Sequence, residues 1–344
     1  MLAVSCIVAF FLAIFGISVI KKFGLKYIQK LSQPIRNDLI IDHSSKKNIL
    51  PFGGIAIILA SLIATSILLI TNYFVFDIPP SSTVIISFVT IICVFVLGFI
   101  DDFAKVTKRN NIGISGKIRF LIEFVIGLVF SYIVTMTPVK QYDINISIPV
   151  PFYGVILLHF NSWFYILFKA FVFTACINAF NITDGLDGLA GTQFLQFAFA
   201  FLIIFLIQVV IGAKIGSGGV SVIYLLTIFS FAILGFLCFN SNPATIFMGD
   251  GGSMMLGSIV GIVSILCNFE LSLIFLCIIP FIETLSVILQ VLSFKLRNGK
   301  RIFKISPIHH HFEALGFKEQ KIVMNFLIVS IFCSSIFIGT IFLK

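Results

Sequence analysis

Ten long stretches of this 344-residue chain carry almost no charge, and they restrict the possible folds more than any other feature. Each is close to the roughly 20 apolar residues that a helix needs to cross a bilayer. Lipid offers backbone polar groups no partners, so such stretches are expected to be helical. The sequence predicts spans at residues 1–20, 53–74, 83–100, 119–137, 163–182, 189–212, 220–239, 253–269, 271–294 and 323–343.

These spans indicate an all-α polytopic membrane protein that forms a single domain over residues 1–344. The composition agrees, because 59% of the residues are hydrophobic and only 11% are charged. Pro280 lies inside the ninth span, where a proline removes a helix hydrogen bond. We therefore expect a kink or break in that helix.

Basic residues indicate how the spans are oriented. The loops after the first, third and ninth spans together hold 19 of the 23 Lys and Arg residues. All three loops lie on one side, and the positive-inside rule assigns that side to the cytoplasm with both termini outside. This distribution also explains the net charge of +9 without a nucleic-acid partner.

The unusual polar residues fall at the same, inner ends of the spans. Acidic residues at membrane depth are costly, so they are candidates for function. Four segments share this side: one with Asp101 and Asp102, one with Asn178, Asn181, Asp184 and Asp187, one with Asn240, Asn242 and Asp250, and one with His309, His310 and His311.

The first two segments are suited to metal or phosphate chemistry. Asp101 and Asp102, with Lys105 nearby, could bind a divalent cation or accept a proton from a phosphate. An interfacial cap on the third span would explain the two aspartates equally well. Residues 178–190 combine amides, carboxylates and glycines that let backbone approach a ligand. A plain turn between helices would explain the glycines but not the four polar side chains.

The other two segments add an anion site and a histidine cluster. Asp250 precedes the expected helix start at Gly251-Gly252-Ser253, and helix N-termini bind anions that a magnesium ion could bridge. The alternative is that Asp250 or Ser253 caps this helix. Three consecutive histidines diverge by about 100° each on a helix, so hydrogen bonding or charge pairing with phosphate is favoured over zinc. Carboxylates and basic residues without a Walker-type loop favour phosphoryl transfer.

These four segments resemble the polyprenyl-phosphate N-acetylhexosamine-1-phosphate transferases. The segment Arg301-Ile302-Phe303-Lys304-Ile305-Ser306-Pro307-Ile308-His309-His310-His311-Phe312-Glu313 narrows the resemblance to the phospho-N-acetylmuramoyl-pentapeptide transferases within that superfamily. The resemblance covers most of the chain in order, including Gln33-Pro34-Ile35-Arg36, His43, Lys46, Gly53-Gly54, Glu283 and residues 286–290.

The resemblance implies a reaction and its participants. UDP-N-acetylmuramoyl-pentapeptide and undecaprenyl phosphate would give lipid I and UMP with Mg²⁺, the first membrane step of peptidoglycan synthesis, in the bacterial inner membrane. It also implies a homodimer. Asp250 would bind the metal, and Asp101 and Asp102 would be catalytic at the lipid-phosphate site, with Asp101 accepting a proton. The implied substrate-binding residues are Lys46, Lys105, Lys117, Asn181, Asp184, Gly185, Leu186, Asp187, Asn240, Phe247, Ser253, His309, His310 and His311.

The sequence departs from this family at positions that are not proposed to be catalytic. Glu123 stands where Gln is usual, Gly251 where Thr is usual, and Asn325 and Leu327 where Arg and Trp are usual. The first inner loop also differs around residues 39–40 and 48–52. These changes alter the expected shape of that loop, which contains Lys46.

Two other functions remain open from the residues. The same chemistry could act on another sugar nucleotide, such as UDP-N-acetylglucosamine, although the His-His-His-Phe-Glu segment argues against it. A transporter or lipid flippase would also carry intramembrane charge and a broken helix. Against a transporter, the polar residues gather at one face and not at mid-membrane, and no paired inverted halves are evident.

Overall fold

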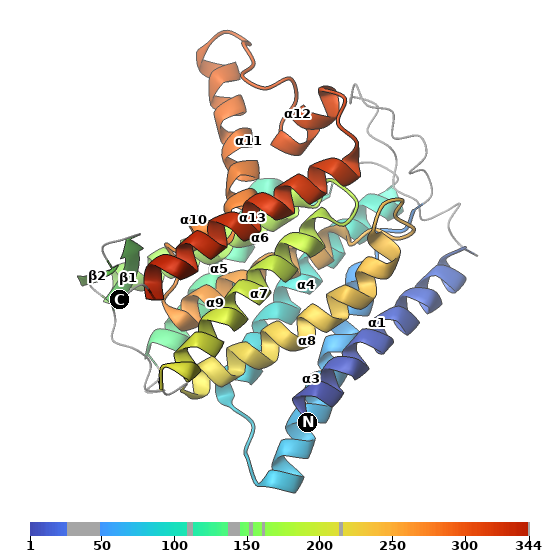
Figure 1. Cartoon of the computed structure of the whole chain (residues 1–344). Coiled ribbons are helices and arrows are strands. Elements are labelled where there is room, and N and C mark those ends of the chain that lie inside the picture. Colours follow the sequence, from blue (N-terminus) through green and yellow to red (C-terminus); the bar gives the residue numbers. More distant parts are fainter. Residues whose placement is uncertain are drawn as a thin grey trace.

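The apolar stretches form helices along nearly their whole lengths. The computed structural model describes residues 1–25, 49–108, 113–136, 145–150, 154–159, 162–212 and 216–342. Within these ranges ten helices are long and apolar enough to cross a membrane, as expected. They are α1 (Leu2–Leu25), α3 (Gly53–Phe76), α4 (Ser82–Lys108), α5 (Gly116–Met136), α6 (Ser162–Thr183), α7 (Leu189–Val210), α8 (Ser217–Asn240), α9 (Gly249–Cys267), α11 (Ile278–Leu296) and α13 (Glu319–Phe342) (Figure 1).

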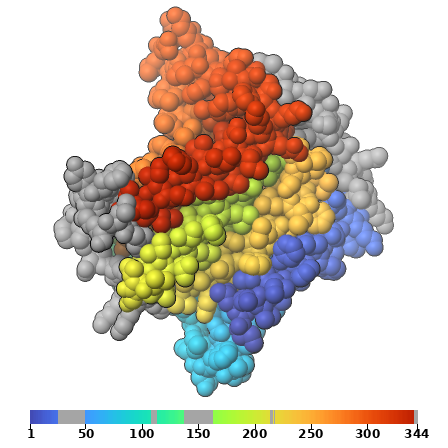
Figure 2. All heavy atoms as spheres, viewed as in Figure 1, coloured from blue at the N-terminus to red at the C-terminus, as the bar shows by residue number. Residues whose placement is uncertain are grey.

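Helix α9 lies at the centre of the bundle. In its span 89% of the residues are buried, whereas no other span exceeds 56%. It packs against α3, α4, α6 and α8, while α13, α7, α8 and α1 lie side by side on one outer face (Figure 2). Small residues let helix backbones approach closely in a membrane. At Gly98 of α4 a Cβ atom would lie only 2.6 Å from the carbonyl oxygen of Asp250, so this contact with α9 leaves no room for a side chain.

The ninth span is broken, as its proline predicts. The expected helix over 271–294 divides into a short α10 (Leu273–Leu276) and α11, with Cys277 between them at φ −124° and ψ 43°. The ring of Pro280 cannot fit against the carbonyl group of Leu276 in a continuous helix, which accounts for a break at this point. Beyond it, α11 projects from the bundle beside the short α12 (Ile308–Ala314) (Figures 1 and 2).

A small β-hairpin lies outside the spans and is a departure from the expected all-α fold. Strand β1 (Asn145–Val150) pairs antiparallel with β2 (Gly154–His159), and Ile148 lies opposite Ile156. The sequence predicts only a connection between spans here, because hydropathy does not separate a short strand from a loop. Pro149 is tolerated in β1 because both strands of a hairpin are edge strands.

A group of buried polar side chains joins the ends of α6 and α9 that lie away from Asp250. The Tyr165 hydroxyl is 3.0 Å from Asn268 Oδ1 and 3.1 Å from Glu270 Oε1. The Lys169 ammonium lies 4.2 Å from the centre of the Tyr165 ring. Burial raises the pKa of Glu270 to about 7, although the positive charge of Lys169 opposes the rise. The sequence alone predicts no role for Lys169, a lone charge within an apolar stretch.

We expect Glu270→Gln to change how stability depends on pH. Folded Glu270 keeps its proton up to about pH 7, whereas an unfolded glutamate loses it near pH 4.5. The contribution of Glu270 to the free energy of unfolding is therefore fully present below about pH 4.5. It is lost as the pH rises to about 7, and the total loss is about 3 kcal/mol. Glutamine cannot ionise, so the thermal midpoint of the variant in detergent should rise relative to wild type between about pH 5 and about pH 8. A difference that does not vary with pH would contradict this assignment.

Candidate active site

Carboxylates from two helices meet at the end of the bundle where α9 begins. Helix α4 continues beyond the expected end of its span to Lys108, so Asp101 and Asp102 lie within a helix and do not cap one. Both are almost fully buried. Asp102 accepts a hydrogen bond of 3.1 Å from the backbone N–H of Gly251, in the first turn of α9. Asp101 accepts one of 2.5 Å from the N–H of Ile114.

Asp250 faces this pair from α9. The helix begins at Gly249, earlier than the sequence predicted, so Asp250 lies in its first turn and not before it. Neither Asp250 nor Ser253 is the N-cap, which is Met248, so the capping alternative is wrong. Asn181 of α6 donates a hydrogen bond of 3.0 Å to Asp250 Oδ1 and another of 3.1 Å to Ser253 Oγ.

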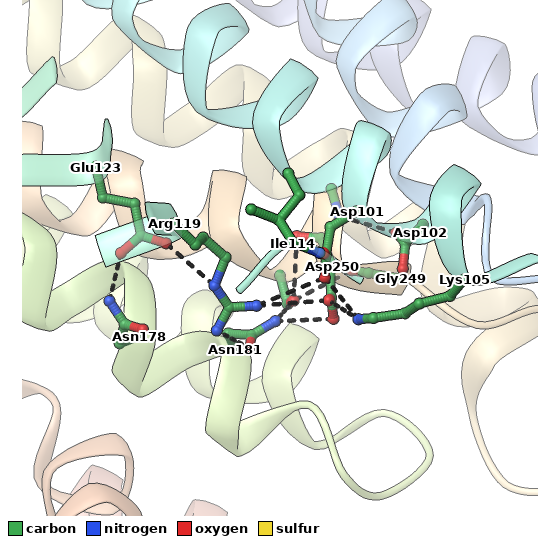
Figure 3. Close-up of polar contacts among 12 residues, drawn as sticks. Asp101, Asp102, Lys105, Ile114, Arg119, Glu123, Asn178, Asn181, Gly249 and Asp250 are labelled. Carbon is green, nitrogen blue, oxygen red and sulfur yellow. Dashed lines mark hydrogen bonds and ion pairs between the residues drawn. The ribbon is translucent and has the colours of Figure 1, made fainter. Parts of the chain in front are cut away.

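Two basic side chains face the acidic groups (Figure 3). The Lys105 ammonium pairs with Asp101 at 2.7 Å and also contacts Asp250 Oδ2. The guanidinium of Arg119 on α5 lies 3.7 Å from carboxylate oxygens of both aspartates. Lys105, Arg119 and Asp250 are each about one fifth exposed. The cluster is therefore open at its edge, where a ligand can reach both cations.

The cluster contains most, but not all, of the predicted catalytic and phosphate-binding residues. The structure brings together Asp101, Asp102, Lys105, Asn181, Asp250 and Ser253. Lys117 is exposed on the first turn of α5 and makes no hydrogen bond or ion pair with other described residues. Arg119, two residues later, makes the contacts expected of Lys117. Lys46 lies outside the described residues.

Sequence reasoning missed Arg119, because its charge was used only to assign the side of the membrane. Its i,i+4 spacing to Glu123 on α5 was the available signal. Glu123 is fully buried and accepts a hydrogen bond of 2.5 Å from the Asn178 side chain of α6. The polar network therefore extends from the carboxylates of α4 and α9 to α5 and α6.

The loop between α6 and α7 is tied to the loop between α8 and α9. Asp187 Oδ2 accepts hydrogen bonds from the N–H of Ala244 at 3.0 Å and from the Asn242 side chain at 3.1 Å. Asn240 accepts one from the N–H of Gly188 and donates one to the carbonyl group of Ile246. Asp187 and Asn240, predicted to contact a nucleotide, thus also hold these two loops together.

Other predicted residues of these loops lie close by. Phe247 is half-buried and its backbone is fixed by Leu50 and Gly53. Asp184 is partly buried, and this loss of water, together with the negative charges of Asp250, Asp102 and Asp187, raises its pKa well above the ordinary value. Gly185 is exposed, whereas Leu186 is buried against α11 and α13. The backbone of Gly185, not the side chain of Leu186, is therefore available to a ligand.

The three histidines point to different partners. His309 is buried and its Nδ1 lies 3.0 Å from Glu283 Oε2 of α11. His310 pairs with Glu313, and His311 Nδ1 accepts a hydrogen bond from the N–H of Lys304. Among the described residues no three His, Cys, Asp or Glu side chains are arranged to hold a metal ion. His309 alone reaches the α6–α7 loop, where a side chain on Gly185 would overlap its ring.

Comparison with known proteins identifies relatives that match most of the chain. The family model described as glycosyl transferase family 4 matches residues 84–268. The phospho-N-acetylmuramoyl-pentapeptide-transferase of Rickettsia canadensis (strain McKiel) is 39% identical over 332 residues, which cover 93% of this chain and 87% of that protein. The protein of the same name from Rickettsia prowazekii (strain Madrid E) is 38% identical with the same coverage. That of Rickettsia bellii (strain OSU 85-389) is 39% identical over 318 residues, covering 89% and 83%.

Proposed function

Because this chain belongs to glycosyl transferase family 4, and within it to the phospho-N-acetylmuramoyl-pentapeptide transferases, we propose that it forms lipid I. The donor is UDP-N-acetylmuramoyl-pentapeptide and the acceptor is undecaprenyl phosphate. An oxygen of the lipid phosphate bonds to the sugar-linked phosphorus, the bond from that phosphorus to the bridging oxygen breaks, and UMP leaves with that oxygen. The observation that carries the proposal is that Lys105 pairs with both Asp101 and Asp250 at one end of a membrane bundle.

Magnesium is the proposed cofactor, and Asp250 is its proposed protein ligand. Mg²⁺ typically uses one or two carboxylates and completes its shell with water and substrate phosphates, so a preformed ring of three protein ligands is not required. Asp250 fits this pattern, because it is partly exposed and oriented by Asn181. When bound, the ion would neutralise charge on the diphosphate of the donor.

Residues of α4 are suited to the acceptor phosphate. Lys105 already bridges two carboxylates and can turn one of its ammonium donors to a phosphate oxygen. Asp101 is fixed by Lys105 and by the N–H of Ile114, so it can orient that phosphate or accept its proton. Little proton transfer is needed at neutral pH, because the second pKa of a phosphate monoester is about 6.

The donor is proposed to occupy the side of the site formed by the α6–α7 and α8–α9 loops. Asp187, Asn240 and Phe247 are assigned to the nucleotide, and Phe247 is exposed enough for its ring to stack near uracil. Asn181, Asp184, Gly185, Ser253 and the His309–His311 segment complete this polar cleft. Lys117 and Lys46 are assigned to phosphate and nucleotide contacts as the resemblance implies.

The lipid chain is proposed to lie along α11. Large apolar side chains on this projecting helix are exposed, and lipid would cover them. They are Phe281, Leu285, Ile288, Leu289, Val291, Leu292, Phe294 and Leu296. Positive loop charge supports a cytoplasmic position for the end that carries Asp250, in the inner membrane. A homodimer is proposed from the family alone.

The test is UMP release by the purified chain in detergent. With the UDP-N-acetylmuramoyl-pentapeptide donor, undecaprenyl phosphate and Mg²⁺, we expect release that requires all three. UDP-N-acetylglucosamine is the competing donor and should give no product. Release with UDP-N-acetylglucosamine alone would assign the same chemistry to another pathway, and no release with either donor from folded protein would favour a transporter.

A further inference from the structure

Arg119 lies at the carboxylate cluster but has no part in the reaction as proposed above. Its guanidinium comes from α5 and faces Asp101 of α4, Asp250 of α9 and Asn181 of α6 (Figure 3). No other described side chain contacts acidic or amide groups from all three of these helices. Arg119 therefore lies where a group bound between Asp101 and Asp250 would meet it.

The described residues leave the hydrogen-bonding capacity of this guanidinium largely unused. Its contacts are 3.4 Å to Asn181, 3.5 Å to Glu123 and 3.7 Å to Asp101 and Asp250. Charge-assisted hydrogen bonds from N–H donors are typically about 2.7–2.9 Å. An arginine has five N–H donors and does not lose its charge. Its neighbours thus attract the guanidinium without saturating it, and one fifth of the side chain is open to a ligand.

Glu123 restricts where this guanidinium can lie. Its carboxylate is fully buried one turn after Arg119 and faces the Nε atom of that residue. Asn178 fixes the second carboxylate oxygen with a hydrogen bond of 2.5 Å. A buried carboxylate separated from its counter-charge is costly, so Glu123 keeps the inner edge of the guanidinium in place. The two terminal nitrogens are left directed toward Asp101, Asp250 and Asn181.

We propose that Arg119 binds a phosphate oxyanion at the exposed edge of this carboxylate cluster and that Glu123 is the residue that positions it. Among the described residues of this site, the carboxylates Asp101, Asp102 and Asp250 outnumber the cations Lys105 and Arg119, so a phosphate needs both cations to approach. A planar guanidinium can bind two oxygens of one phosphate, which a lysine cannot. The source of the phosphate, lipid acceptor or nucleotide donor, rests on the proposed function.

The deciding experiment measures binding of inorganic pyrophosphate with MgCl₂ to the full chain in detergent by calorimetry. Loss of a hydrogen-bonded charge should raise the Kd of Arg119→Gln at least about tenfold. Glu123→Gln keeps the positive charge of Arg119 but removes the carboxylate that holds its guanidinium in place, and should raise the Kd about threefold. The double variant leaves no buried carboxylate unpaired, so it should match Arg119→Gln. Arg297→Gln, an exposed charge at the end of α11, is the matched control and should bind like wild type.

Unchanged pyrophosphate binding by Arg119→Gln and by the folded double variant would overturn the proposal. Kinetics then identify the source of the phosphate, because each substrate can be varied separately. Arg119→Gln and Glu123→Gln should raise the KM for the same substrate. Glu123→Gln should leave kcat unchanged, whereas partial unfolding of this variant would lower kcat. If neither KM changes, the proposal is also wrong. If wild type releases no UMP but binds pyrophosphate through Arg119, the proposed function fails and this inference stands.

Discussion

Asp250→Asn is expected to lower the rate of UMP release at least about a thousandfold, the largest effect of any single substitution at this site. Asparagine has the same shape but lacks the negative charge that attracts Lys105 and the proposed magnesium ion. Its amide would also present N–H donors where Lys105 now contacts a carboxylate oxygen. The effect should fall on kcat at saturating donor and lipid, measured as UMP formed by equal amounts of folded protein.

The chain provides a matched control for this substitution. Asp77 ends α3 with φ 53°, is exposed, and has the left-handed conformation that asparagine also adopts readily. Asp77→Asn should therefore keep the wild-type rate and thermal midpoint. If Asp250→Asn retained more than about a tenth of the wild-type rate, Asp250 would not be the required metal ligand, because such ligands contribute several kcal/mol.

Gly98→Ala is expected to have the second-largest effect, although the residue touches no substrate. The added Cβ would lie 2.6 Å from the Asp250 carbonyl oxygen and 2.7 Å from Gly251 Cα, so the backbones of α4 and α9 must separate. Overpacking of this kind typically costs about 1–3 kcal/mol. A shift of about 1 Å between catalytic groups can cost about a hundredfold in rate, and this separation moves Asp101 and Asp102 away from Asp250.

The measurement compares UMP release and thermal midpoint with those of Gly339→Ala. Gly339 is a helical glycine of α13 with nothing within 4 Å of an added Cβ, so its substitution should leave both quantities unchanged. A folded Gly98→Ala protein with the wild-type rate would show that the site tolerates movement between α4 and α9. It would then be wrong to attribute the alignment of the carboxylates to this contact.

The positions of the spans could be predicted because lipid imposes one strong condition on them. Long uncharged runs predicted the ten spanning helices of the described residues, and Pro280 predicted the break between α10 and α11. Helix ends were less predictable, because hydropathy marks where apolar residues stop and not where backbone hydrogen bonds stop. Helix α4 continues two turns beyond its apolar run, since Lys105 pairs with Asp101 one turn away and offsets its charge.

The candidate site was predicted as a set of carboxylates but not as a network. Asp101, Asp102 and Asp250 were evident because acidic residues are rare at membrane depth. Arg119 and the Glu283–His309 pair were not, because each pairing depends on helices that are adjacent only in the folded chain. The positive-inside rule already accounts for a basic residue at the cytoplasmic end of a span. The sequence therefore offered no reason to look for the proposed phosphate-binding role of Arg119.

The near-complete enclosure of α9 separates Asp250 from the properties of the surrounding bilayer. Changes in bilayer thickness act by tilting or straining helices that touch lipid, and α9 has few such contacts. Thinner or thicker membranes should therefore affect acceptor entry along the exposed α11 before they affect the geometry around Asp250. The enclosure also means that a substitution almost anywhere on α9 meets neighbouring protein, so this helix should accept less sequence change than any other span.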